Sequence, residues 1–475
     1  MKSDIQDTRL ISDFSVINDD LCRDAILGFC DSPLFHDDGN RYEENFYGRR
    51  LRPHVIKYLN FTKPLETGET CNYAAFAANR ILFAMNEVDF LMLPSGDLKP
   101  KDFEDRYSNA RISQAHLGMP YLEKYLFSFL DKEIVVSDNW SVKSVEEYFK
   151  GFAEQASKIT STPATEAILS SNQPSVSARD WLIQLAPDFL IESSPMARYA
   201  SGNYGPISSS LFKIIIDELG YGEHDRKHSS LFEETLKSAE LSSEPHKYWQ
   251  YYLNGSLLLA NYYNMITRNR RYFFRYIGAI YQAETGFIRT CALWRDALKS
   301  ALPSLDVRYF DEHCHIDIDH SRMAFDSLVK VAIEAYGNYA AQEIVRGFEE
   351  ARFVSEIAEK DFVAQVKWKD ESTLNTTRYK QIWPAVQAAY KAGEVDIGPL
   401  DEPRNELSIT HSHDGDELCH VSEGTMEFLN GFQHSTILKK DEGIIIQRNR
   451  LHGALIQSEN CKYEIYSIKD VYRWL

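Results

Sequence analysis

The residues best suited to chemistry are grouped at positions 311–320, where three histidines and four acidic residues occur together. On a helix, His313, Asp317 and His320 stand at i, i+4 and i+7, so their side chains share one face. Imidazole, carboxylate and imidazole on one face suit iron, zinc or manganese. A solvated polar face on a surface helix is the alternative. The amphipathic sequence on both sides of the motif favours the metal site.

Three glutamates elsewhere are embedded in apolar runs and are therefore expected to be buried. Glu192 follows Phe-Leu-Ile, Glu218 comes just after three isoleucines, and Glu284 lies among Ala, Ile and Tyr. Each could instead stand at the edge of the core, exposed or paired with arginine. Because a buried carboxylate needs a partner, a metal centre shared with the 313–320 face explains all three better. With Asp317 they supply four negative charges, which offset two Fe(II) ions.

The chain has 475 residues, enough for two or three domains, and a net charge of −18. This charge disfavours nucleic acid and anionic membranes as partners and is compatible with a cationic small substrate. Seven scattered cysteines without a CxxC pair predict reduced thiols in a cytoplasmic protein. The sequence shows neither a signal peptide nor an apolar run of membrane-spanning length.

The elements that must position these residues are predicted to be helices as far as about residue 365. Apolar periodicity indicates helices at 181–200, 211–236, 248–266, 272–298 and 307–336, which together form an all-α bundle. Residues 1–135 are also expected to be helical. They carry no chemical constellation, so a supporting or dimerisation role is expected for them.

The period changes towards the C-terminus, where seven short alternating runs follow a turn-rich linker at 393–403. They lie at 406–409, 418–421, 425–429, 436–438, 443–447, 454–457 and 463–468. These runs predict a β-barrel or a double-sheet jelly roll. His411 and His413 lie on one strand face, and Glu417 and then Gly424 complete a pattern that resembles the first cupin motif. His452, nine residues after Gly443, resembles the second, although its spacing is short and a metal-free barrel is the alternative. On barrel alternation, Arg448 and Tyr463 are predicted to face the metal, with core packing or exposure as the equal alternative.

The strings at 217–222, 249–254 and 413–420 are specific enough to indicate a family. With them, the chain resembles the haem-oxygenase-like di-iron oxidases that are fused to a cupin. The resemblance implies a multidomain fold, α then β, with an N-terminal helical dimerisation domain at 1–135, a haem-oxygenase-like all-α bundle at 136–360 and a cupin β-barrel at 376–475. It implies a homodimer.

The same resemblance implies which residues bind iron. Two irons in the helical domain would be held by Glu192, Glu218, His228, Glu284, His313, Asp317 and His320. One iron in the cupin would be held by His411, His413 and His452. Glu417 would stand beside that iron without binding it.

The activity that the resemblance implies is iron- and O2-dependent and needs an external reductant. The helical domain would hydroxylate guanidine nitrogens of L-arginine or Nω-methyl-L-arginine, and the cupin would rearrange the product oxidatively to an N-nitrosourea. The alternative product is a diazeniumdiolate or another N–N bonded amino acid. The alternative functions for the whole chain are a ferritin-like oxidase and a non-catalytic iron sensor. A cationic substrate predicts acidic residues beyond the ligands, for which Glu223 and Asp225 are candidates.

One ligand pair predicts how the helical site assembles. Glu218 and His228 are ten residues apart, so a regular helix would point their side chains in directions about 80° apart around its axis. Gly220 and Gly222 lie between them, each costing roughly 1 kcal/mol relative to alanine inside a helix. We therefore expect residues 218–228 to be helical only marginally and to become ordered as a second, weaker iron binds. A rigid preformed site is the alternative.

Overall fold

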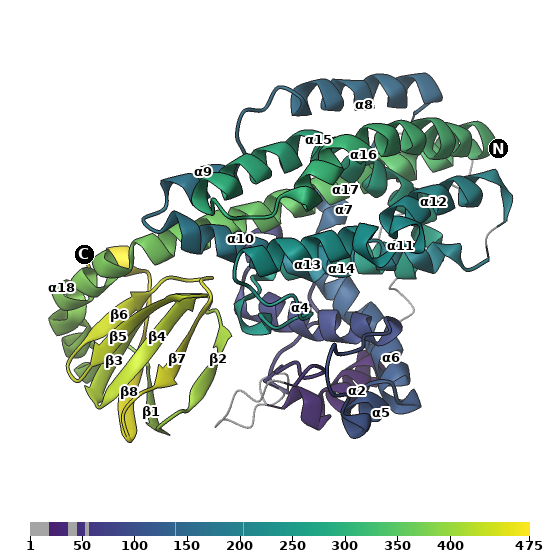
Figure 1. Ribbon diagram of the computed structural model, residues 1–475. Coiled ribbons are helices and arrows are strands. Elements are labelled where there is room, and N and C mark those ends of the chain that lie inside the picture. Colours follow the sequence, from purple (N-terminus) through teal and green to yellow (C-terminus); the bar gives the residue numbers. More distant parts are fainter. Residues whose placement is uncertain (1–18, 37–44, 53–56, 138, 203) are drawn as a thin grey trace.

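The computed structural model describes residues 19–36, 45–52, 57–137, 139–202 and 204–475. Figure 1 shows a large helical part that precedes a compact β part, with the C-terminus beside the last long helix. The predicted α-then-β class is therefore confirmed.

The helical part begins with a group of N-terminal helices. They are α2 (Asp19–Cys30), α4 (Tyr73–Asn86), α5 (Pro100–Arg106), α6 (Asn109–Phe127) and α7 (Leu130–Glu133). The bundle that follows comprises α8 (Val142–Ala156), α9 (Pro163–Ser170), α10 (Pro174–Phe189), α11 (Ser194–Ala197), α12 (Gly205–Glu218), α13 (His228–Ser238), α14 (Asn254–Arg268), α15 (Phe273–Ala301), α16 (Arg308–Met323) and α17 (Lys330–Asp370). A π-helical turn, Ala324–Val329, joins α16 to α17.

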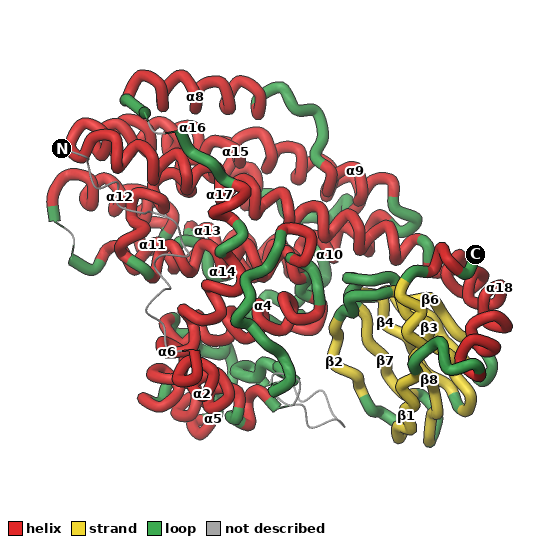
Figure 2. Tube along the Cα trace, turned by 180° about the vertical axis from the view of Figure 1, so that it is seen from behind, coloured by secondary structure: helices red, strands yellow, loops and turns green. Residues whose placement is uncertain are grey.

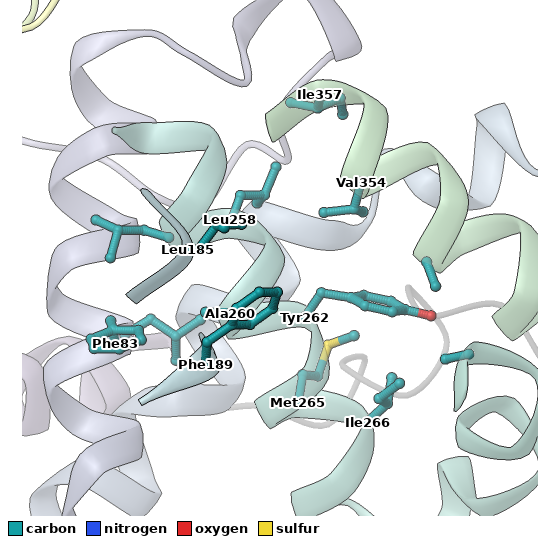
Figure 3. Close-up of a cluster of buried hydrophobic side chains, with 14 of the residues drawn as sticks. Phe83, Leu185, Phe189, Leu258, Ala260, Tyr262, Met265, Ile266, Val354 and Ile357 are labelled. Carbon is teal, nitrogen blue, oxygen red and sulfur yellow. The ribbon is translucent and has the colours of Figure 1, made fainter. Parts of the chain in front are cut away.

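One continuous apolar core runs from the N-terminal helices into the bundle. Figure 3 shows part of it, in which Leu258 and other side chains of α14 lie between Phe83 of α4 on one side and Val354 of α17 on the other. The two longest bundle helices approach closely because each has a glycine at the contact. A Cβ on Gly278 of α15 would collide with the Ile344 carbonyl of α17. The core therefore holds α15, which carries Glu284, in a fixed position.

Two of the predicted helices were wrong in length, because each is interrupted. The helix expected at 181–200 ends at Phe189, and Ser193 takes a left-handed conformation (φ 63°) before α11. Pro195 could not continue α10, because its ring would clash with the helix carbonyl four residues earlier. The helix expected at 211–236 is interrupted between α12 and α13, where Gly220, Tyr221 and Gly222 all have positive φ.

The β part consists of two four-stranded antiparallel sheets with strand orders β1-β8-β3-β6 and β2-β7-β4-β5. The strands are β1 (Ile397–Pro403), β2 (Leu407–His411), β3 (Asp416–Glu423), β4 (Thr425–Gly431), β5 (His434–Lys439), β6 (Gly443–Ile446), β7 (His452–Ile456) and β8 (Asn460–Lys469). Seven of them were predicted. The exception is β1, which was assigned to the linker at 393–403. It is an edge strand with mostly exposed side chains, so it has no apolar alternation to reveal it.

Helices enclose the β part on two sides. The helix α18 (Ser372–Lys391) packs on the sheet that contains β6, through Tyr379, Ile382 and Val386. The end of α17 inserts Trp368 into the core between the sheets. In Figures 1 and 2, strand β2 lies on the side of the β part nearest α4. There, Arg80 of α4 donates hydrogen bonds to the carbonyl and hydroxyl of Thr410 on β2.

Candidate metal centres

Seven side chains meet inside the helical part and form what we call the helical centre. Glu192 lies in the turn after α10, Glu218 is the last residue of α12, and His228 is the first residue of α13. The α15 helix contributes Glu284, and α16 contributes His313, Asp317 and His320, all buried. The two helix interruptions therefore matter: both occur next to a candidate ligand and turn it towards α16.

The side chains of the helical centre divide into two groups of three. Donor atoms of Glu192, His228 and His313 lie within 4.8 Å of one another, and so do those of Glu218, Glu284 and His320. The groups are adjacent. Glu218 Oε2 lies 2.8 Å from His228 Nδ1, and Asp317 Oδ1 lies 3.2 Å from His313 Nδ1. Two neighbouring groups with a carboxylate at their junction suit a pair of metal ions.

Unsatisfied atoms support this interpretation. Five buried polar atoms of the centre form no contact with hydrogen-bond geometry, although the three imidazole nitrogens among them lie near carboxylates: Glu192 Oε2, His228 Nδ1, His313 Nε2, Asp317 Oδ2 and His320 Nδ1. Buried polar atoms are normally paired, and leaving one unpaired costs roughly 1–3 kcal/mol. Oxygen and nitrogen donors of this kind suit iron. The residues present therefore fit a di-iron group.

Charges within the helical centre strongly perturb its pKa values. Burial alone would lower the pKa of His313, but the Glu192 and Asp317 carboxylates hold it well above its usual value. Against burial, Glu218 and Glu284 raise the pKa of His320 to about 11. Burial and then the Asp317 charge raise the pKa of Glu284 to about 8. Without metal, the imidazoles therefore carry protons that balance part of the carboxylate charge.

Neighbouring polar groups orient the ligands. The Tyr309 hydroxyl donates to Glu192 Oε1 at 2.9 Å, and Ser193 Oγ donates to Glu218 Oε2 at 3.2 Å. His320 Nε2 lies 3.3 Å from Asp217 Oδ2. Since a carboxylate accepts, Nε2 carries the proton, and Nδ1 is directed to Glu218 and Glu284. Such outer partners fix the tautomer and direction of metal-binding imidazoles.

A cavity of about 920 Å³ opens beside the helical centre, and Glu192, Glu218, Glu284 and His313 form part of its lining. Aromatic side chains form much of the wall. Five further carboxylates also line it: Glu147, Asp188, Glu349, Glu356 and Glu359. The acidic lining expected for a cationic substrate is thus found, but Glu223 and Asp225 were the wrong candidates. Both are exposed in the segment between α12 and α13.

A second group, which we call the three-histidine centre, lies in the β part. The donor atoms of His411, His413 and His452 come within 4.8 Å of one another. The sheet register produces this arrangement, because His411 at the end of β2 pairs directly with His452 at the start of β7. The His411 and His452 Nδ1 atoms lie 2.8 and 2.9 Å from backbone carbonyls. Since carbonyls accept, both Nε2 atoms are free for a metal.

The imidazoles of this centre are neutral. Burial is the largest cause that lowers the pKa of His413 to about 4 and that of His452 to about 3. Burial and the neighbouring His452 hold the pKa of His411 well below its usual range. Deprotonated imidazoles are the form that binds metals, so the three side chains fit an iron ion.

The other predicted residues of the β part occupy different positions. Glu417 Oε2 lies 3.2 Å from His413 Nε2 and has no hydrogen-bond partner, so Glu417 adjoins the centre. The Tyr463 hydroxyl donates to Glu402 at 2.9 Å, and the ring packs in the core between the sheets. Arg448 follows β6, where its backbone N–H donates to Asp416. The roles of all three remain predictions.

Sequence reasoning missed a contribution from the N-terminal region. The Tyr73 ring, at the start of α4, stacks on His413 with 6.1 Å between ring centroids and 11° between planes. Its backbone N–H donates to Asp414 at 2.8 Å. The charge of Arg52 also contributes to the lowered pKa values of all three histidines. No motif could reveal this, because more than 300 residues separate Tyr73 from Asp414.

Comparisons with known proteins place these centres in context. Residues 179–354 match the model of a family described as iron-containing redox enzymes. Over 454 residues, 94% of this chain and 95% of the relative, the sequence is 43% identical to a nitrosourea synthase of Streptomyces achromogenes subsp. streptozoticus. The chain belongs to the nitrosourea synthase family. It is an iron-dependent oxidoreductase, as the sequence predicted.

A solved structure gives no further information about the fold. An HTH_3 family transcriptional regulator from Vibrio cholerae is 16% identical and covers 32% of this chain and 92% of its own, with a TM-score of 0.14. A TM-score this low does not indicate a shared fold. Among the described residues, no helix combines the length and apolar character needed to cross a membrane.

Proposed function

We propose that this chain is an iron- and O2-dependent N-oxygenase. The helical domain hydroxylates guanidine nitrogens of L-arginine or Nω-methyl-L-arginine. The cupin-like β domain then converts the hydroxylated guanidine oxidatively to an N-nitroso product, an N-nitrosourea. The observation that carries the proposal is the presence of two separate groups of metal-binding side chains, one beside a large acidic cavity, in a relative of a nitrosourea synthase.

In this proposal two irons in the helical domain supply O2 activation. Each hydroxylation inserts one oxygen atom of O2 into an N–H bond and reduces the other to water with two electrons from an external reductant. The protein residues bind and orient. Glu192 and His313 bring the iron site to the wall of the cavity, and the aromatic lining keeps bulk water from the reacting nitrogen.

The second step requires a site for the hydroxylated product. His411, His413 and His452 would hold an iron ion there, which would supply the oxidative chemistry. Glu417 adjoins this site, and burial raises its pKa to about 7, so it can hold or accept a proton there. The cupin-like domain therefore has the components for oxidative rearrangement, while the helical domain has the cavity for the first substrate.

Mass spectrometry of reactions with Fe(II), O2 and a reductant tests the proposal. Nω-methyl-L-arginine and L-arginine should gain one and then two oxygen atoms, labelled by ¹⁸O2, before an N-nitroso product forms. A diazeniumdiolate would be recognised by its different mass. O2 consumption that does not depend on any arginine derivative would contradict the proposed activity and would favour an iron store.

A separate variant tests whether the helical domain hydroxylates the substrate without the metal of the cupin-like domain. The double substitution His411→Ala with His413→Ala removes two imidazoles of the three-histidine centre without touching the helical one. The variant should accumulate the hydroxylated guanidine and form no N-nitroso product. Loss of all N-oxygenation in a folded variant would show that the first step also depends on the cupin-like domain.

We also propose a homodimer formed through the N-terminal helices. Leu91 and Leu93, between α4 and α5, are 73% and 60% exposed. Exposed leucines so close together are a feature of association surfaces. Replacing both by glutamate should convert the dimer to a monomer in sedimentation velocity. Leu169→Glu in α9, where leucine is 51% exposed, is the matched control. A monomeric parent protein would exclude the dimer.

A further inference from the structure

One carboxylate in the cavity has no assigned task. Asp188 lies in the last turn of α10, four residues before Glu192, and lines the cavity together with the candidate iron ligands Glu192, Glu284 and His313. Among the described residues, no side chain donates a hydrogen bond to its carboxylate or forms an ion pair with it. Asp188 is half-buried, and a carboxylate withdrawn from bulk water in this way is normally found with a cation or a donor.

The cavity itself supplies no such cation. Arg352 is the one lysine or arginine among the described residues that line the cavity. Its guanidinium is already bound by Glu349 at 2.6 Å and by Glu356 at 2.7 Å. Those three residues belong to α17, whereas Asp188 belongs to α10 and precedes the candidate iron ligand Glu192 by four residues. The described lining therefore leaves no lysine or arginine to pair with Asp188, and a cation that enters the cavity can take that place.

We propose that Asp188 binds the positively charged guanidinium group of the substrate and places its nitrogens beside the helical centre. The inference rests on the proposed function and deepens it by assigning the residue that selects a cationic side chain. A carboxylate and a guanidinium are planar and can form two parallel hydrogen bonds, so their pairing fixes orientation as well as position. Asp188 and Glu192 lie on either side of the end of α10 and line the same cavity, which brings the bound group near the iron site.

The rest of the cavity is compatible with such a ligand. The carboxylates of Glu147 and Glu359 add negative charge to a lining that already holds the Glu349–Arg352–Glu356 cluster. This field favours entry of a cation over a neutral molecule. Burial, and secondarily the charge of Glu192, raises the pKa of Asp188 to about 7, so a nearby positive charge would favour its ionised form. A guanidinium would provide that stabilisation.

Equilibrium binding to the full-length Fe(II) protein without O2 tests the proposal, because no turnover occurs. The probes are L-arginine and L-citrulline, in which a neutral urea replaces the guanidinium. Asp188→Asn should weaken L-arginine binding about 30-fold or more, as expected for loss of one member of a buried charge pair. L-citrulline binding should change little, so the preference for guanidine over urea should largely disappear.

Three controls separate recognition from structure. Asp188→Glu keeps the charge and should restore part of the preference. Glu154→Gln removes a charge from an exposed carboxylate of α8 that lies outside the cavity lining and should change L-arginine affinity less than about threefold. Iron content and thermal unfolding of Asp188→Asn should match those of the parent. Loss of iron from that variant would show instead that Asp188 supports the metal centre, and would overturn the proposal.

The outcomes distinguish this inference from the proposed function. If the parent protein binds L-arginine but Asp188→Asn binds it equally well with the same preference over L-citrulline, the assignment of Asp188 is overturned alone. If the parent oxidises and binds no guanidine compound, the proposed function fails and the assignment fails with it.

Discussion

The helical centre gathers four carboxylates and three imidazoles, whereas the three-histidine centre gathers imidazoles with one carboxylate nearby. Their imidazole pKa values move in opposite directions. Carboxylates raise those of His313 and His320 despite burial, while burial lowers those of His413 and His452. The helical centre is therefore an anionic cluster that needs metal charge. The three-histidine centre holds neutral ligands that are ready to bind.

The two centres also differ in the backbone that supports them. His411 and His452 are fixed by adjacent strands and by hydrogen bonds to backbone carbonyls. In the helical centre, α16 and α15 are regular, but Glu218 and His228 stand on either side of an irregular segment, 219–227. Most of that segment is exposed. The comparison predicts one rigid centre and one centre whose second half depends on metal for its order.

The largest expected effect tests whether the two centres are independent. The parent should bind about three irons per chain. His320→Ala should lose iron from the helical centre and reduce N-hydroxylation about 100-fold or more, while one iron stays in the cupin-like domain. His452→Ala should lose the iron of the cupin-like domain and keep both the helical iron and N-hydroxylation. Metal analysis with single-turnover assays measures both, and His315→Ala, on the exposed face of α16, is the control. Loss of iron from both centres in either variant would show that the two centres are not independent.

The next effect concerns the support of the three-histidine centre by the helical part. Trp368 of α17 is almost fully buried in the core between the sheets. Trp368→Ala should destabilise the cupin-like domain by about 3–5 kcal/mol and weaken its iron binding, because the cavity left cannot be refilled. Denaturant unfolding and iron content give the measurement, with Trp368→Phe as a milder change. If the cupin-like domain kept its stability, the packing of Trp368 of α17 between its sheets would not be needed for that stability.

A smaller effect should separate the two glycines of the irregular segment. Gly220 and Gly222 both have positive φ, but only at Gly220 would a Cβ lie 2.5 Å from the Lys227 nitrogen. Gly222→Ala should cost about 1 kcal/mol, and Gly220→Ala should cost more because it also displaces the segment that leads to His228. Fe(II) titration should show weaker binding of one helical iron in Gly220→Ala. Equal affinities in the two variants would contradict the steric argument.

The subtlest expected effect is a change in mobility. Hydrogen exchange of residues 219–227 should slow by about tenfold when Fe(II) binds, because His228 then becomes fixed to the ion. Strands β2 and β7 should change less, since their pairing does not depend on the metal. Equal protection of the segment with and without Fe(II) would favour a preformed rigid helical centre.

The sequence alone determined the features that depend on local periodicity. A helix necessarily places His313, Asp317 and His320 on one face. The expectation that one strand carries both His411 and His413 was wrong, because β2 ends at His411 and His413 lies in the connection to β3. Seven strands and most of the bundle helices were likewise predicted, because their apolar side chains recur with the period of the element. The edge strand β1 was not, since its exposed side chains leave no such pattern.

Only the tertiary structure decided where those elements stop and what lies between them. The apolar run continues through Leu190 and Ile191 to Glu192, yet α10 ends at Phe189 in the packed bundle. The break between α12 and α13 falls in the glycine-containing segment expected to be only marginally helical, and the packing turns Glu192 and His228 towards α16. The contact of Tyr73 with His413 joins segments far apart in the chain. No sequence motif indicated Asp188, because its position in the cavity depends on the helices that pack around it. Local sequence encodes the direction of a side chain within its element, whereas its partners depend on how distant elements pack.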